Sequence, residues 1–181
     1  SVIKRAGLRF AICYEDRSVG EAVKKSVINK EQTIAHAFES LQWVAGNWFI
    51  DDAYLKIDGK PVLMVFGPMI LGEGKLKQVS EKISPKPVTF CLSHLKKSGG
   101  GDSSFAWPPV DGGRRVLDSD WKKELGDLYK KEKSEIKPIP IAFPGYRDFY
   151  ERAGIRKSYG SIADRDGLTW NESLDLAFSQ S

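Results

Sequence analysis

Four short apolar segments, separated by helical patterns, constrain the fold of this chain most strongly. They are rich in Val, Ile and Phe and are bounded by polar residues, Gly or Pro: "LRFAICY" (8–14), "PVLMVFG" (61–67), "PVTFCLS" (87–93) and "IPIAFPG" (139–145). Nearly continuous runs of this kind are typical of parallel strands that are buried on both faces. They therefore predict the strands of a mainly parallel sheet.

Helical periodicity occupies the intervals between these segments. From about residue 31 to residue 46, one apolar stripe is formed by Ile34, Ala37, Phe38, Leu41, Val44 and Ala45. Trp121, Leu125, Leu128 and Tyr129 predict a second helix that begins near "DSDW", and a shorter helix is expected at about 74–83. Thr169 and Glu172 suggest a capping box for a last helix, whose apolar face would hold Trp170, Leu174, Ala177 and Phe178.

Turn residues add two local predictions. Gly7 stands where a helix C-cap would be, so the chain is expected to open on the tail of a helix. Asp58 and Gly59 lie between two apolar runs and predict a hairpin turn, with residues 54–57 pairing briefly with the next strand.

The strand-helix order, repeated along the chain, predicts an α/β protein. Four such units are half of a (β/α)8 TIM-type barrel. We therefore expect one domain over residues 1–181 that is an incomplete barrel, without its N-terminal and C-terminal strands. A small doubly wound sheet is the alternative.

Composition narrows the class of protein. With 41% hydrophobic and 29% charged residues, the chain is expected to be soluble and globular. Its net charge of +4 is spread through helices that also carry Glu and Asp, which does not favour nucleic-acid binding. No apolar run approaches the roughly 18 residues of a membrane span. Cys13 and Cys91 lie in predicted buried strands and are expected to be packed thiols. No metal or cofactor motif is present, so no cofactor is expected.

Polar, aromatic and glycine residues follow the predicted strands. In parallel sheets, ligands bind at the carboxyl ends of the strands, so these residues are candidates for a binding site. The candidates are Tyr14, Glu15, Asp16, His94, Trp107, Tyr146 and Asp148. Trp107 lies in a long predicted loop (95–115) and either stacks on a sugar ring or packs within the loop. Because strand residues alternate in direction, one of Glu15 and Asp16 should line the cleft and the other should anchor a loop.

Three segments together carry a resemblance to a known family: "AGLRFAICYEDRS", "YLKIDGKPVLMVFGP" and "IAFPGYRDFYERAG". With them, the chain resembles the glycoside hydrolase family 71/99-like proteins, which include endo-α-mannosidases. The resemblance implies a barrel that acts on α-linked glycans, mannan-type or other polysaccharides, in a secreted or periplasmic setting. Pro144, Gly145, Tyr146 and Asp148 match the family's Pro-Gly-Tyr-x-Asp segment, in which the tyrosine faces the sugar. Glu15 and Asp16 match a position that lines the cleft.

The family's Asn-Glu-Trp-x-Glu-Gly segment, which supplies its catalytic carboxylates, is not found. "TWNES" (169–173) imitates its start, but the predicted capping box explains these residues as a helix start. We therefore expect the main catalytic carboxylates to lie outside this chain, so that the fragment alone is inactive. Glu15 with Asp148 or Asp164 is the weaker candidate pair. "VFGP" departs from the family, which leaves the exact substrate open. The oligomeric state is open as well. Two alternatives remain: a non-catalytic, doubly wound domain that binds a ligand or partner, and a carbohydrate-binding barrel without activity.

Overall fold

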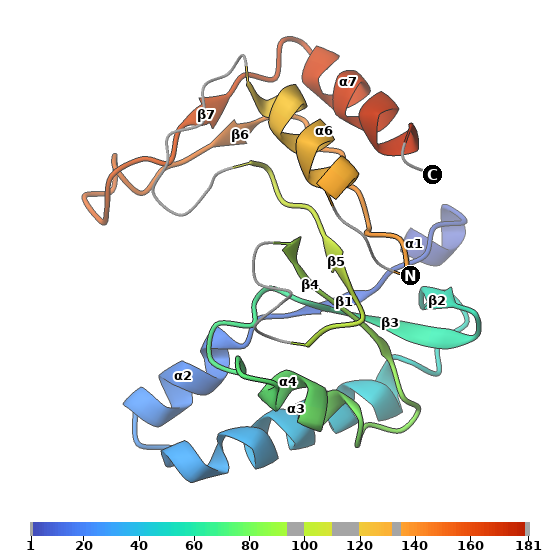
Figure 1. Ribbon diagram of the computed structural model, residues 1–181, viewed down its shortest axis with the longest axis vertical. Helices are drawn as coiled ribbons and strands as arrows, with labels where there is room; N and C mark the ends of the chain where they lie inside the picture. The colour runs from blue at the N-terminus through green and yellow to red at the C-terminus, as the bar shows by residue number, and fades with distance from the viewer. Residues whose placement is uncertain (1, 94–99, 110–119, 132–134, 180–181) are drawn as a thin grey trace. The chain divides into compact units, whose positions relative to one another are not determined.

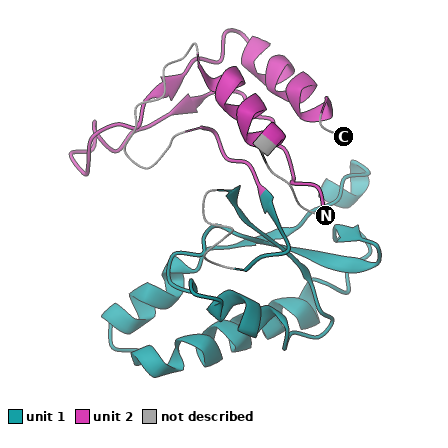
Figure 2. Cartoon of the chain, in the orientation of Figure 1, with its two compact units in different colours: residues 1–104 teal, residues 105–181 magenta. Residues whose placement is uncertain are grey.

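Residues 2–93, 100–109, 120–131 and 135–179 are described by the computed structural model (Figure 1). They fall into two compact units, Ser1–Ser104 and Phe105–Ser181, which Figure 2 shows in different colours. The expectation of a single domain over residues 1–181 stays a prediction.

A mainly parallel sheet forms the centre of the first unit. Strands β1 (Ile12–Tyr14), β3 (Lys60–Val65) and β4 (Val88–Leu92) lie side by side in parallel, and β5 (Ser103–Phe105) lies beside β4. The short β2 (Lys56–Ile57) pairs with β3 in the antiparallel direction. This alternation of parallel strands with helices confirms the predicted α/β class and three of the four predicted strands.

Both turn predictions are confirmed. Asp58 and Gly59 connect β2 to β3 with φ angles of 49° and 75°, the positive values that a tight two-residue hairpin turn requires. Helix α1 (Val2–Arg5) is followed by Gly7 with a φ of 67°, and the N–H of Leu8 donates to the carbonyl of Ile3. A glycine after the helix allows this left-handed conformation without a clash of its own Cβ atom.

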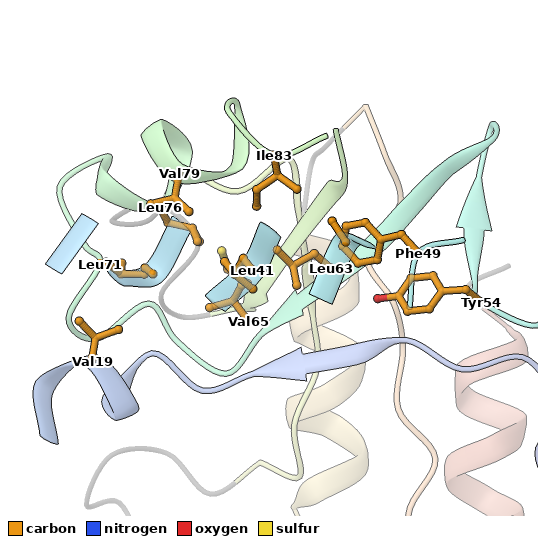
Figure 3. Close-up of a cluster of buried hydrophobic side chains, with 13 residues drawn as sticks. Val19, Leu41, Phe49, Tyr54, Leu63, Val65, Leu71, Leu76, Val79 and Ile83 are labelled. Carbon is orange, nitrogen blue, oxygen red and sulfur yellow. The ribbon is translucent and has the colours of Figure 1, made fainter. Parts of the chain in front are cut away.

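Helices α2 (Arg17–Lys24), α3 (Thr33–Asn47) and α4 (Lys75–Ser80) cover one face of this sheet (Figure 1). A short 3-10 helix, η1 (Lys30–Gln32), precedes α3 and is capped by Asn29. The predicted stripe of α3 is confirmed: Ala37, Leu41 and Ala45 are fully buried in the core, and Ile34, Phe38 and Val44 pack against it. Figure 3 shows this core, in which side chains of α3 and α4 meet those of β3.

Tyr54 ties the first two parallel strands together inside this core. Its hydroxyl donates to the carbonyl of Val62 at 2.7 Å and accepts from the N–H of Ile12 at 3.1 Å. Its ring packs edge-on against Phe10, with ring centroids 5.2 Å apart. One side chain therefore satisfies backbone groups of both β1 and β3 while filling apolar space (Figure 3).

The strand register separates the two faces of the sheet. Leu63, Val65 and Cys91 belong to the core between the sheet and the helices. Cys13 and Met64 lie in register on the opposite face, because neighbouring strand residues alternate in direction. Cys13 is exposed, which corrects the prediction that it is a buried thiol. The physical reason is its position on β1, the edge strand of the sheet, on the face away from the helices.

The described residues of the second unit form two helices and a small hairpin. Helices α6 (Trp121–Lys131) and α7 (Leu168–Phe178) contact each other, and β6 (Tyr146–Arg147) pairs with β7 (Ser161–Ile162) in the antiparallel direction. The predicted stripe of α6 is confirmed, since its apolar residues pack in one core. The buried members of this core are Ala106, Trp121, Leu125, Tyr129, Phe143 and Ile162.

The prediction of a regular strand at 139–145 is wrong. Ile139 forms a single bridge with Phe105, and the next N–H groups are bound by side chains instead of a neighbouring strand. The N–H of Ile141 donates to the Tyr129 hydroxyl, and that of Phe143 donates to the Ser173 hydroxyl, each at 3.0 Å. Three prolines explain the difference, because Pro138, Pro140 and Pro144 have no N–H to give to a ladder.

Two further expectations are corrected. Residues 103–105 form β5, whereas the sequence predicts that they belong to the long loop 95–115. The capping box at Thr169 is absent, because α7 already begins at Leu168 after the left-handed Gly167. Thr169 and Ser173 are buried, whereas Trp170 is 43% exposed and Phe178 is 66% exposed. The inward face of α7 thus combines two buried hydroxyls, which bind the carbonyls of Ala163 and Phe143, with Leu176, which packs against the core.

Candidate functional site

The residues that follow the parallel strands of the first unit gather at one edge of the sheet. The N–H of Phe66, directly after β3, donates to Tyr14 at the end of β1, and the N–H of Leu92 at the end of β4 donates to Gly67. The carboxyl ends of the strands therefore meet, as a parallel sheet requires. His94 lies outside the described residues.

Asp16 is a structural anchor at this edge. Its side chain is buried, and its Oδ2 atom accepts hydrogen bonds from the N–H groups of Met69, Ile70 and Leu71 at 2.7, 2.6 and 2.8 Å. A Cβ atom at Gly67 would lie 2.5 Å from the Asp16 Oδ1 atom, so the close approach requires glycine. Asp16 thus holds the loop after β3.

Glu15 and Tyr14 flank this anchor. Glu15 is exposed and, by the alternation of β1, falls on the same side as Cys13, away from the helices. Tyr14 is half-buried against the core; burial raises the pKa of its hydroxyl, a hydrogen bond with Ser18 opposes this, and the Asp16 charge adds to it. The two carboxylates at the strand end therefore differ in environment. The assignment of Tyr14, Glu15 and Asp16 to substrate binding stays a prediction.

In the second unit, the carboxylate of Asp148 is likewise engaged in structural hydrogen bonds. Its side chain is fully buried; Oδ1 accepts from the N–H of Tyr150 at 2.9 Å, and Oδ2 accepts from the N–H of Tyr159 at 2.9 Å and from Arg156 at 2.7 Å. The Tyr159 N–H, with the Tyr150 N–H and Arg156, lowers the pKa of this carboxyl below 3.8, although burial opposes the shift. Asp148 therefore ties together both ends of the segment 148–159.

Arg156 lies between two tyrosine rings of the same segment. Its guanidinium carbon is 3.5 Å from the ring centroid of Tyr159 and 4.3 Å from that of Tyr150. Tyr146 is half-buried beside it: burial, with the Asp148 charge, raises the pKa of its hydroxyl, whereas Arg156 acts in the opposite direction. We call Tyr146, Asp148, Tyr150, Arg156 and Tyr159 the tyrosine-arginine cluster.

This cluster brings together two of the predicted site residues, Tyr146 and Asp148. Sequence reasoning missed Tyr150, Arg156 and Tyr159, although the aromatic and basic residues of "YRDFYERAGIRKSY" (146–159) were the available signal.

Trp107 and the proposed acid pair are the remaining predicted residues within the described ranges. Trp107 lies two residues beyond the end of β5 and is 44% exposed. Its stacking on a sugar ring stays a prediction. Glu15 and Asp148 belong to different units, and their pairing stays a prediction.

The segment 148–159 is expected to lose stability when the pH falls below about 3.8, the ordinary value for the Asp148 carboxyl. Because the pKa of Asp148 is lower in the folded state, its contribution to stability is present above the unfolded-state pKa and is lost as the pH falls through the folded-state pKa. Thermal melts from about pH 2 to about pH 7 would measure this dependence.

The matched control for this pH dependence is Asp148→Asn. The pKa values of Asp51 and Glu172 are also lowered, by hydrogen bonds to Lys4 and Lys122 respectively, so the wild type loses stability in acid for several reasons. Only the part due to Asp148 should vanish in the variant, which should show a shallower decline. Equal slopes in both proteins would contradict the ionised, hydrogen-bonded state of Asp148.

Among the described residues, no cluster of three or more His, Cys, Asp or Glu side chains is arranged to hold a metal ion. No helix within the described ranges is both long and apolar enough to cross a membrane.

The parallel strands, the helix layer and the polar residues at the strand ends define a class of protein: an α/β fold consistent with part of a (β/α)8 barrel. Among solved structures, the chain is similar to the GH99 endo-α-mannosidase from Bacteroides thetaiotaomicron, with a TM-score of 0.54 and 12% identity. The similarity covers 81% of this chain and 49% of that one, so this chain spans about half of the enzyme's length.

At this low identity, the similarity shows the fold alone. No protein-family model matches the sequence. No curated protein matches it either.

Proposed function

We propose that this chain forms the substrate-binding part of a glycoside hydrolase-like barrel that binds α-linked, mannan-type glycans. The observation that carries the proposal is the similarity of 81% of the chain to the fold of an endo-α-mannosidase. The tyrosine-arginine cluster supports it, because tyrosine offers an apolar ring and a polar hydroxyl to a sugar. Tyr146 supplies such a group immediately after Pro144 and Gly145.

We propose further that the main catalytic carboxylates lie outside this chain. A glycosidase needs two carboxyl groups across the scissile bond, one of which must be protonated to act as the acid. Asp16 and Asp148 are buried in backbone hydrogen bonds, and Glu172 is paired with Lys122 and Arg165. These three carboxylates act in structure. Because these carboxylates are used in structural contacts, they also favour the second candidate function, a carbohydrate-binding barrel without activity.

Calorimetric titration of the 181-residue chain with an α-linked manno-oligosaccharide tests the binding role. We expect saturable binding, and Tyr146→Ala should weaken it about tenfold, which corresponds to about 1.4 kcal/mol. Phe178→Ala is the matched control, since this exposed aromatic residue lies at the end of α7 and outside the cluster. A β-linked oligosaccharide of equal length should bind weakly. Equal affinity for both sugars, or no binding, would contradict the proposal.

An aryl α-mannoside tests the location of the catalytic carboxylates. We expect this chain to release no measurable aryl alcohol, because the acid and base of the reaction are absent. Release that is abolished by Glu15→Gln, with sugar binding intact, would instead make Glu15 a catalytic residue. Glu15 is exposed, so the substitution should leave the fold unchanged.

A further inference from the structure

Tyr150 differs from the other exposed apolar residues of segment 148–159. Phe149 is 61% exposed and Ile155 is 67% exposed. Tyr150 is 49% exposed, but the Arg156 guanidinium covers one face of its ring at 4.3 Å. The exposed surface of Tyr150 is therefore concentrated on the opposite ring face and the ring edge.

Arg156, on the covered face of the Tyr150 ring, is itself held by several contacts. Arg156 donates to Asp148 at 2.7 Å and to the Lys157 carbonyl at 2.9 Å, and it rests on the ring of Tyr159. Asp148 in turn accepts the N–H of Tyr150 itself. Because the ring, the cation and the backbone are already fixed, a ligand that stacks on Tyr150 has little side-chain entropy to remove.

The electrostatics of the stack suit a neutral ligand. The carboxylate of Asp148 lies 2.7 Å from Arg156, so it balances the guanidinium charge behind the ring. The exposed residues next to Tyr150 in the sequence include Glu151 and Arg152, which offer hydrogen-bond acceptors and donors. A pyranose ring has this same pattern, with an apolar C–H face surrounded by hydroxyl groups.

A protein partner fits this surface less well. Stable protein interfaces usually bury about 800 Å² on each side, and their centres are poor in charged residues. In the segment 148–159, charged residues instead follow the exposed apolar ones: Glu151 and Arg152 come after Phe149 and Tyr150, and Arg156 comes after Ile155. Of the two exposed rings in this segment, Phe149 and Tyr150, Tyr150 is the one with a guanidinium behind it.

We infer that Tyr150 is a stacking subsite for one pyranose ring of a glycan, with Arg156 and Tyr159 as its support. The inference rests on the proposed function for the class of ligand. It adds a contact outside the Pro-Gly-Tyr-x-Asp segment and assigns Asp148 a positioning role, in which its carboxylate holds the Arg156 side chain against the ring.

Titration of the 181-residue chain with an α-linked mannotriose tests this subsite. Tyr150→Ala should weaken binding about tenfold, equivalent to about 1.4 kcal/mol, because it removes the ring. Tyr150→Phe keeps the ring and should bind within about twofold of the wild type. Phe149→Ala is the matched control, a neighbouring exposed ring without the support, and should leave the affinity unchanged. Thermal melts of each variant monitor folding.

NMR spectra of tyrosine ring protons give a direct readout that separates the two proposals. The Tyr150 signals, assigned by their loss in Tyr150→Phe, should shift on addition of the mannotriose. If the mannotriose binds but neither these signals nor the Tyr150→Ala affinity changes, the subsite is overturned and the proposed function stands. If only a β-linked glycan shifts them, the subsite stands and the α-glycan function fails.

Two more outcomes would overturn the subsite. One is the absence of a Tyr150 shift with every sugar tested. The other is a change of sedimentation in Tyr150→Ala with unaltered sugar affinity, which would make the surface a protein contact.

Discussion

Replacing Asp16 by alanine is expected to lower the free energy of unfolding of the first unit by about 3 kcal/mol or more. One carboxylate oxygen accepts three backbone N–H groups, from Met69, Ile70 and Leu71. Hydrogen bonds to charged groups contribute about 1.5–3 kcal/mol each, and buried donors that lose their partner cost more than exposed ones. Urea denaturation, with amide hydrogen exchange at residues 69–71, would measure the loss.

The matched control is Glu15→Ala at the neighbouring position. Glu15 is exposed, so its removal should change stability by no more than about 0.5 kcal/mol. Asp16→Asn keeps one carbonyl oxygen for the three donors and should fall between the two. If both alanine variants unfolded at the same urea concentration, the anchoring role of Asp16 would be wrong.

Trp121→Ala is expected to destabilise the second unit by about 3–5 kcal/mol, the usual cost of a cavity left by a large buried aromatic side chain. Trp121 is 2% exposed and packs edge-on against Phe143, with ring centroids 5.2 Å apart. Phe143 directly precedes the segment that carries Tyr146. Circular dichroism during thermal unfolding would measure the change.

Trp170→Ala provides the comparison for this prediction. Trp170 lies on the second helix of the same unit but is 43% exposed, so its removal leaves no closed cavity. It should cost much less than Trp121→Ala. A loss of stability for Trp170→Ala as large as that for Trp121→Ala would contradict the described core of this unit. Sugar binding should also survive in the Trp170 variant.

Part of the candidate site could be predicted from the sequence because its residues are close along the chain. Tyr146 and Asp148 follow one apolar segment and lie within three residues of each other in the sequence. Arg156 and Tyr159 reach Asp148 only because the chain folds back through a turn that includes Gly154, with a φ of 68°. No periodicity marks such a return, so these contacts could not be predicted.

The fourth apolar segment shows a second limit of sequence reasoning. Its composition resembles that of a buried strand, and residues 139–143 are indeed partly or fully buried. Prolines at 138, 140 and 144 remove the donors that a ladder needs, and hydroxyls of Tyr129 and Ser173 satisfy neighbouring N–H groups. Apolar character predicted the burial of this segment, whereas its hydrogen-bonding partners determined its conformation.

The sequence by itself determined the α/β class, helices α3 and α6, and the β2–β3 hairpin, because periodicity and turn preferences depend on residues close along the chain. Only the tertiary structure decided which carboxylates are buried. Asp16 and Glu15 are adjacent acids in the sequence, yet Asp16 binds three N–H groups of a loop more than 50 residues away and Glu15 is exposed. Such roles follow from contacts between distant segments, and these form only when the chain is folded.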